Sequence, residues 1–217
     1  KIASKFAHDL LLSDTSSLHG VASRSLDKAQ AFGEQNKSIR NYGSYEELAE
    51  DPEIDIVYIA TPHVHHFENT MMCLKNGKWG LWVNLLGLVA AEVRSMIDEV
   101  RSRNLFLLEG IWTRFIPATE KLLELLDQKV IGDIHHLTAD FGFRAEYDPD
   151  GRLFNKKLGG GSLLDVGIYP IYFSLLALGL PMEVKAMARF AETDVDSYCS
   201  MIFNYDNNAM ANLESSI

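Results

Sequence analysis

Helix-like and strand-like segments alternate through the first half of the chain, and this alternation constrains the fold more than any other feature. Apolar segments rich in β-branched residues, such as residues 54–60, predict strands buried on both faces. Amphipathic segments such as residues 90–103 predict the helices between them. This order indicates a parallel, doubly wound α/β sheet with right-handed crossovers. The expected strands are 19–23, 54–60, 79–83 and 105–108, and the expected helices are 3–12, 26–35, 45–50, 66–76 and 90–103.

The pattern changes after Trp112, where long strands follow one another with turns between them. The sequence Tyr-Asp-Asn-Asn-Ala at 205–209 is typical of a hairpin turn and therefore of antiparallel pairing. We predict a first domain over residues 1–114 and a second, α+β domain over residues 115–217. The second domain's expected helices are 118–126 and 162–178, and its expected strands are 134–143, 183–190 and 198–205.

Composition excludes several classes of function. The formal net charge of −10, with no run of Lys and Arg, argues against a surface for nucleic acid. The only two cysteines, Cys73 and Cys199, lie in apolar surroundings, so neither a disulfide framework nor a thiolate metal site is expected. No apolar run reaches the roughly 18 residues of a membrane span, and no cleavable leader opens the chain. We therefore expect a globular protein of the cytoplasm.

The stretch from Gly159 to Tyr169 is the strongest candidate for chemistry. Three glycines run into an apolar helix on which Asp165 and Tyr169 lie one turn apart, and Gly167 leaves space between them and a flat ligand. A proton donor and its orienting acid are expected to share this face. The alternative is that the glycines cap a buried helix and Tyr169 binds the backbone.

Doubly wound sheets bind ligands at the carboxyl ends of their strands. Ser23 and Arg24 follow the strand at 19–23, where the ribose of a dinucleotide would lie. An acid there favours a free 2′-hydroxyl, whereas Ser and Arg favour a 2′-phosphate, so we predict NADP. The alternative is an exposed Arg24 in a helix-capping turn.

Thr61, Pro62 and His63 follow the strand at 54–60, and His66 opens the next helix. The His-x-His-His spacing admits a metal site, as in barrel amidohydrolases. Such hydrolases need further ligands at later strand ends, where only His135 and His136 remain. We therefore expect no metal and a loop that closes over the cofactor.

Trp112, Arg114 and Phe115 lie close to the expected domain boundary. A Trp and an Arg at such a place can form the wall of a substrate pocket. The alternative for Trp112 is ordinary packing between domains.

Taken together and in this order, these motifs resemble the glucose-fructose oxidoreductase and inositol dehydrogenase (Gfo/Idh/MocA) family. Within it they are most similar to the branch of dimeric dihydrodiol dehydrogenases and NADP-dependent D-xylose dehydrogenases. The likeness covers essentially the whole chain. Its motifs are Ala22-Ser23-Arg24, Ala60-Thr61-Pro62-His63, Gly77-Lys78, Ala90 to Arg94, Glu109 with Trp112 to Phe115, Ile131-Gly132, and Gly159 to Tyr169.

The resemblance implies a Rossmann domain followed by an α/β domain whose open, mainly antiparallel sheet often forms a dimer face. It implies hydride transfer between NADP and a carbon of a sugar or cyclic diol, within a homodimer. Ser23 and Arg24 then contact the 2′-phosphate, and Pro62 and His63 belong to the cofactor loop. Asp165 and Tyr169 belong to the acid/base helix, and the substrate pocket is lined by Trp112, Arg114 and Phe115.

The chain departs from the family in two respects. It opens at Lys1-Ile2-Ala3 without the family's first strand and Gly-x-Gly-x-x-Gly/Ala turn, and it stops at Ile217 where members continue, so we expect both termini to be incomplete. The family's Glu-Lys-Pro, whose lysine polarises the reacting oxygen, is replaced by Val-Asn-Leu at 83–85, which puts Asn84 at the lysine's position. The alternatives are a local reading-frame slip and a nucleotide-binding pseudoenzyme or regulator.

Overall fold

The computed structural model describes residues 2–83 and 85–217. The chain divides into two compact units, the first ending at Gly110 and the second running from Ile111 to Ile217. We describe each unit by itself. The domain limits 1–114 and 115–217 stay a prediction.

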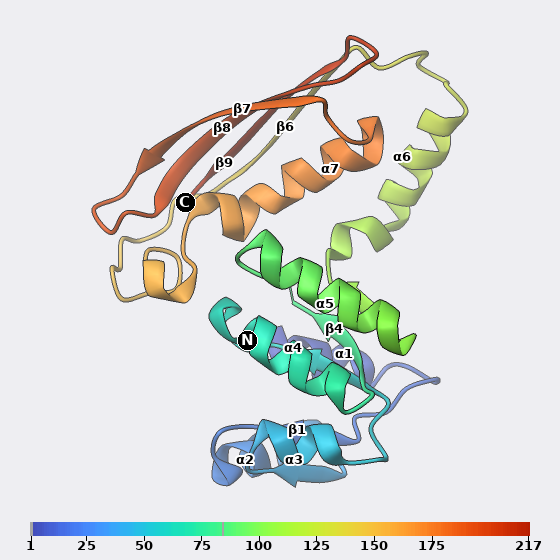
Figure 1. Ribbon diagram of the computed structural model, residues 1–217, viewed down its shortest axis with the longest axis vertical. Coiled ribbons are helices and arrows are strands. Elements are labelled where there is room, and N and C mark those ends of the chain that lie inside the picture. The colour runs from blue at the N-terminus through green and yellow to red at the C-terminus, as the bar shows by residue number, and fades with distance from the viewer. Residues whose placement is uncertain (1, 84) are drawn as a thin grey trace. The chain divides into compact units, whose positions relative to one another are not determined.

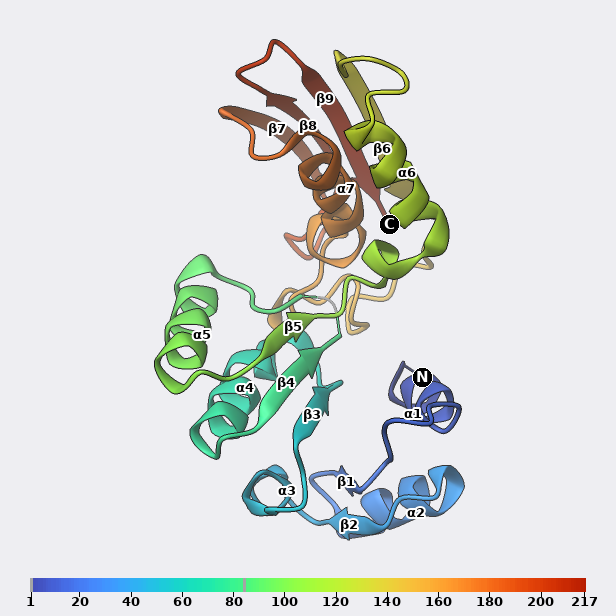
Figure 2. The same ribbon diagram turned by 90° about the vertical axis from the view of Figure 1, so that its right-hand side faces the viewer.

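The first unit alternates helices and strands, as its sequence predicts (Figures 1 and 2). The Gly20–Ala22 and Ile56–Ile59 strands are shorter than expected, and the strand at Arg40–Tyr42 was not expected, because its three residues are polar or aromatic and show no apolar run. The elements are α1 (Ile2–Leu10), β1 (Gly20–Ala22), α2 (Leu26–Asn36), β2 (Arg40–Tyr42), α3 (Tyr45–Glu50), β3 (Ile56–Ile59), α4 (His66–Lys75), β4 (Trp79–Trp82), α5 (Ala90–Arg103) and β5 (Leu107–Glu109).

Every strand pairing in the first unit is parallel. β1 pairs with β2, while β3, β4 and β5 form a separate sheet with β4 in the centre. Figure 2 shows β3, β4 and β5 side by side, and α4 packs on this sheet and against α5. The predicted doubly wound parallel α/β fold is confirmed, although no strand among the described residues joins β1 to β3.

Polar contacts around Asp51 connect the β1–β2 sheet to the β3–β5 sheet. The Asp51 carboxylate accepts hydrogen bonds from the Tyr42 hydroxyl and, at 2.6 Å, from Arg40 Nη1, both on β2. The buried Lys78 Nζ, just before β4, donates to the backbone oxygens of Asp51 at 2.5 Å and Ile54 at 2.8 Å. We call these five residues the Asp51 cluster. These side chains fix the segment from Asp51 to Ile54, which lies between the two sheets, and among the described residues no strand pairing joins the sheets there.

Trp82, the last residue of β4, lies at the centre of the first unit's packing. Its side chain is fully buried, and Nε1 donates to Thr70 Oγ1 on α4 at 2.5 Å. Gly80 precedes it on the same face of the strand, and a Cβ on Gly80 would lie 1.7 Å from Trp82 Cη2. Only glycine leaves space for the indole, so these two residues are matched to each other.

The second unit contains a four-stranded sheet in the order β6-β9-β8-β7. β7, β8 and β9 are antiparallel neighbours, and β6 runs parallel to β9, so the predicted mainly antiparallel sheet is confirmed. The predicted hairpin lies between β8 and β9, where Tyr205 N donates to Ala209 O at 3.1 Å. The elements are α6 (Pro117–Asp127), β6 (His136–Gly142), α7 (Ile168–Leu178), β7 (Glu183–Phe190), β8 (Asp196–Asn204) and β9 (Met210–Ser216).

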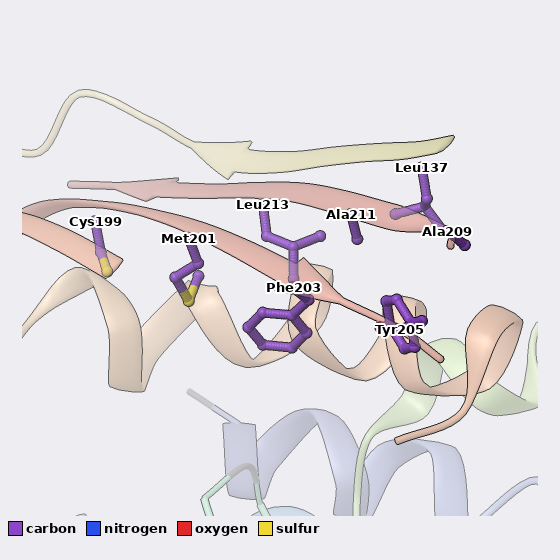
Figure 3. Close-up of a cluster of buried hydrophobic side chains, with 8 residues drawn as sticks. All are labelled: Leu137, Cys199, Met201, Phe203, Tyr205, Ala209, Ala211 and Leu213. Atoms are coloured by element: carbon purple, nitrogen blue, oxygen red, sulfur yellow. The ribbon is translucent and has the colours of Figure 1, made fainter. Parts of the chain in front are cut away.

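One face of this sheet carries the core of the second unit. Figure 3 shows Met201 and Phe203 of β8 pointing toward the helical layer, with Leu213 of β9 beside them. Ile171 and Phe173 of α7 pack against the same cluster. The helical stretch Lys156–Leu178 is long and apolar enough to cross a membrane by length and composition alone, but its α7 portion covers this core.

The segment expected as one helix over 162–178 has two parts. Residues Leu163–Gly167 form a wider π-helical turn, and α7 follows from Ile168. Pro170 has no amide hydrogen and disfavours a regular α-helical turn before it, and π-helical turns are often found at functional sites. Gly167 also differs from expectation. A Cβ on it would lie 3.1 Å from Ser215 Oγ of β9, so its missing side chain makes room for the sheet rather than for a ligand.

Candidate functional site

Ser23 and Arg24 lie at the carboxyl end of β1. Ser23 N donates to Tyr42 O at 3.3 Å, which continues the β1–β2 pairing, and Arg24 is exposed. Ser25, the N-cap of α2, makes no side-chain capping bond. Within residues 2–83 and 85–217, no ion pair of Arg24 occurs. A guanidinium, two hydroxyls and a helix N-terminus therefore offer donors to an anion.

The His66 side chain holds the loop after β3 through contacts with backbone oxygens. His66 is fully buried, with Nε2 2.9 Å from Thr61 O and Nδ1 2.6 Å from Leu85 O. Its ring lies 5.4 Å from that of His63, and Pro62 is exposed. Both nitrogens of His66 thus lie against backbone oxygens, and the side chain supports the loop after β3.

No metal site accompanies the His-x-His-His spacing in the described part of the chain. No three His, Cys, Asp or Glu side chains gather there in a group that could hold an ion. The thiols offer no alternative nucleophile, because burial raises the pKa of Cys73 to about 11 and also raises the pKa of Cys199.

The segment after β4 is held from two sides. Leu85 O contacts His66, and Leu86 N donates to Glu109 Oε1 at the end of β5 at 2.9 Å. Leu85 has φ of 92°, a left-handed conformation that is strained for leucine and closed to proline. Asn84, the candidate catalytic position, lies outside the described residues.

Tyr169 lies in the first turn of α7 and contacts Trp112, which is 57 residues away in the sequence. Trp112 Nε1 donates to the Tyr169 hydroxyl at 3.3 Å, and the two rings meet edge to face at 6.3 Å. Phe141 of β6 lies 5.3 Å from the Tyr169 ring. Trp112 and Phe115 are both more than half exposed, at 59% and 58%, whereas Arg114 is partly buried. The structure thus brings Trp112 and Phe141 to Tyr169.

Asp165 lies on the π-helical turn with its side chain 15% exposed. Its partner is Arg152, from the long loop between β6 and α7, whose two terminal nitrogens reach both carboxylate oxygens. Arg152 and Phe141 were not singled out in the sequence, because a lone Arg in a loop and a Phe in a strand carry no local signal. The contacts of Arg152 with Asp165 and of Phe141 with Tyr169 join residues that are far apart in the sequence, so no local pattern predicts them.

Comparisons with known proteins agree over both units. The description "oxidoreductase family, NAD-binding Rossmann fold" matches residues 1–85, and the GFO/IDH/MocA C-terminal domain matches residues 119–217. The trans-1,2-dihydrobenzene-1,2-diol dehydrogenase of Xenopus tropicalis is 40% identical over 91% of this chain and 60% of its own length. The chain therefore spans about three fifths of that relative.

Solved structures are similar over the same extent. A 3-ketoreductase from Actinomadura kijaniata in complex with NADP and TDP-benzene gives a TM-score of 0.87, at 28% identity over 96% of this chain and 64% of that chain. An aldose-aldose oxidoreductase from Caulobacter crescentus complexed with glycerol gives a TM-score of 0.88, at 25% identity over 95% of this chain and 65% of that chain.

The parallel unit, the mixed-sheet unit and these matches define the class of the protein, a chain of two units with the NAD-binding Rossmann fold of an oxidoreductase family. Within that class, the chain belongs to the Gfo/Idh/MocA family, and the resemblance seen in its motifs is confirmed.

Proposed function

We propose that the whole protein is an NADP-dependent dehydrogenase that acts on a secondary alcohol of a sugar or cyclic diol. The hydrogen bond from Trp112 Nε1 to the Tyr169 hydroxyl carries this proposal. A tyrosine phenol in water has a pKa of about 10, so it needs a neighbouring donor or charge to exchange a proton near neutrality. The Trp112 donor, 3.3 Å from the Tyr169 hydroxyl oxygen, holds that hydroxyl in one place, from which it can exchange a proton with a substrate hydroxyl.

The roles of the other residues follow from their contacts. NADP, when bound, supplies the hydride acceptor or donor. Ser23 and Arg24 hold its 2′-phosphate, and the loop Thr61-Pro62-His63 lies along it with His66 as support. This assignment is supported by the exposed Arg24 guanidinium, for which the described residues show no acidic partner.

Tyr169 exchanges the substrate's hydroxyl proton, and the Asp165 carboxylate, oriented by its ion pair with Arg152, accepts a hydrogen bond from a neighbouring substrate hydroxyl. Phe141 and Trp112 exclude water from the phenol. Arg114 and Phe115 extend the pocket wall. A substrate with two adjacent hydroxyls fits this pair of groups better than a simple alcohol does.

A second candidate is a nucleotide-binding regulator that keeps the pocket and lacks the chemistry. It is favoured by Asn84, which carries no charge at the position of the family's lysine. On β4, just before this position, Trp82 packs over Gly80 and donates a hydrogen bond to Thr70 of α4, so the unusual sequence of the strand is packed as part of the unit. The two candidates differ in turnover and agree in NADP binding.

The experiment is an NADP reduction screen of the full-length protein against aldoses and cyclic trans-diols, with Tyr169→Phe as the variant. We expect turnover to fall about 10²- to 10⁴-fold in Tyr169→Phe while the dissociation constant for NADP stays the same. Tyr172→Phe, on the same helix, is the matched control. Near-normal turnover in Tyr169→Phe would remove this tyrosine from the mechanism. NADP binding without turnover on any substrate would establish the regulator.

We also propose a homodimer that works in the cytoplasm. The face of the second unit's sheet that points away from α7 exposes Met187, Tyr198, Ile202 and Met210 on three strands. These apolar side chains lie on the same face as Lys185, Arg189 and Glu214, and such a mixed face suits a second copy of itself related by a two-fold axis. Ile202→Glu should then give a monomer by sedimentation equilibrium, and an unchanged mass would count against this face.

A further inference from the structure

The turn that carries Asp165 is bound by a carboxylate from a distant strand. Asp196, the first residue of β8, accepts two hydrogen bonds at Oδ2, from Leu163 N at 2.7 Å and from Ser162 Oγ at 2.7 Å. Ser162 Oγ also lies 3.0 Å from Ser215 Oγ on β9. The start of the helical segment is therefore joined to two strands of the sheet.

The backbone before this turn is shaped to admit the carboxylate. Gly161 has φ of 122°, and a Cβ on it would lie 2.3 Å from Asp196 Oδ1. Any other residue would be strained and would push the carboxylate away. Ser162 is fully buried, so neither it nor Gly161 contacts a ligand directly. These two residues and Asp196 form a unit that we call the Asp196 cap.

The Asp196 cap binds the N-terminal end of the helical segment, where backbone amides lack partners within the helix. Amide groups at a helix N-terminus have no partner within the helix, and a negative charge there is stabilised by the helix dipole. The turn from Leu163 to Gly167 is π-helical, so its hydrogen-bond pattern departs from that of a regular α-helix. The external carboxylate thus sets the direction in which Asp165 leaves the turn and α7 begins.

We propose that Asp196 is a positioning residue for the reaction, which holds Asp165 and Tyr169 in register through Leu163 N and Ser162 Oγ. This inference rests on the proposed function. It separates the two carboxylates of the region: Asp165, paired with Arg152, faces the substrate, whereas Asp196 never touches it. It also explains why the glycine run ends in Gly161-Ser162, a pair that the acid/base chemistry itself does not use.

The test compares Asp196→Ala and Asp196→Asn in the full-length protein with Asp194→Asn. Asp194 is the matched control, because its carboxylate is 81% exposed and asparagine tolerates its φ of 59°. Asp196→Ala removes both hydrogen bonds. Asp196→Asn keeps an acceptor oxygen without the charge. Its turnover and its amide exchange should lie between those of the wild-type protein and those of Asp196→Ala.

We expect Asp196→Ala to raise amide hydrogen exchange over residues 163–169 and to lower kcat about 10- to 100-fold, with KM changed much less. NADP affinity and the control should stay unchanged. The emission assigned to Trp112, obtained by difference from Trp112→Phe, should also shift, since it reports the place of the Tyr169 hydroxyl.

The outcomes separate this inference from the proposed function. Unchanged exchange and unchanged Trp112 emission in Asp196→Ala would overturn the inference, and so would faster exchange with normal kcat. If the wild-type protein shows no turnover, the proposed dehydrogenase activity is wrong. A shift of the Trp112 emission in Asp196→Ala would then still show whether the Asp196 cap positions Tyr169. If Asp196→Ala does not fold, Ser162→Ala removes one donor to the same oxygen and is read in the same way.

Discussion

Replacing Gly80 with alanine should destabilise the first unit because of Trp82. The new Cβ would lie 1.7 Å from Trp82 Cη2 and 2.3 Å from Cζ3, whereas carbon atoms rest about 3.5 to 4 Å apart. The indole is fully buried, so it has to move by roughly 2 Å and lose its bond to Thr70. Overpacking costs about 1 to 3 kcal/mol, and a buried hydroxyl left unpaired costs about 1 to 3 kcal/mol more.

The expected loss is therefore about 2 to 6 kcal/mol, which lowers the melting temperature by about 2 to 4 °C for each kcal/mol. Trp82→Leu alone should cost about 2 to 4 kcal/mol through the cavity and the lost hydrogen bond. In the double variant the clash is gone, so the two costs should not add. We expect a coupling of at least about 2 kcal/mol in a double-mutant cycle, because Trp82→Leu removes both the clash and the hydrogen bond that make Gly80→Ala costly.

The assay is urea and thermal unfolding of the full-length protein followed by far-ultraviolet circular dichroism, because tryptophan fluorescence changes with the substitution itself. Gly43→Ala is the control, since its Cβ would meet Leu26 Cβ at an ordinary 3.5 Å. Additivity within about 0.5 kcal/mol would refute the matching of Gly80 to Trp82. It would also remove the packing argument that this segment's sequence is genuine.

Three further results are expected. Arg24→Ala should erase a preference for NADP over NAD of about ten-fold or more, measured as the ratio of the two dissociation constants. Hydrogen bonds from Tyr42, from a backbone amide and from Arg40 hold the pKa of Asp51 below its usual range. Asp51 therefore stabilises the fold above a pH of about 4, and this stabilisation is lost as the pH falls further. In unfolding curves measured against pH, Asp51→Asn should reduce the loss of stability below pH of about 4. Asn84→Lys should raise turnover about 10²- to 10³-fold relative to Asn84→Gln, whereas adding Leu85→Pro should lower the melting temperature, because φ of 92° is closed to proline.

Much of the fold follows from local sequence. The apolar strand Ile56–Ile59 and the amphipathic helix Ala90–Arg103 lie where their patterns predict them, although Ile56 is 47% exposed, so the strand is not buried on both faces as expected. β2 was missed, because Arg40-Asn-Tyr gains its strand conformation from pairing with β1 rather than from its own residues. Strand limits in the second unit shift by a residue or two for the same reason.

The candidate site was only partly predictable. Asp165 and Tyr169 could be identified because glycines and an apolar helix mark them locally. Trp112 was predicted as a pocket residue, but its contact with Tyr169 was not predicted, and Arg152 and Asp196 were not singled out, because these residues meet the helix only on folding. His66 shows the opposite limit: sequence placed it at the start of α4, but only the structure shows both of its nitrogens bound to backbone oxygens.

The edge strand β7 has a consequence for handling the protein. All eight of its residues are exposed, and its outer edge presents unpaired amides and carbonyls to any other extended chain. Val184 and Phe190 would favour such strand addition, whereas Lys185, Arg189 and the irregular register at Arg189/Phe190 oppose it. Neutralising the two cations should therefore promote aggregation through intermolecular sheet growth, and concentrated preparations should be most soluble where both charges are retained at low ionic strength.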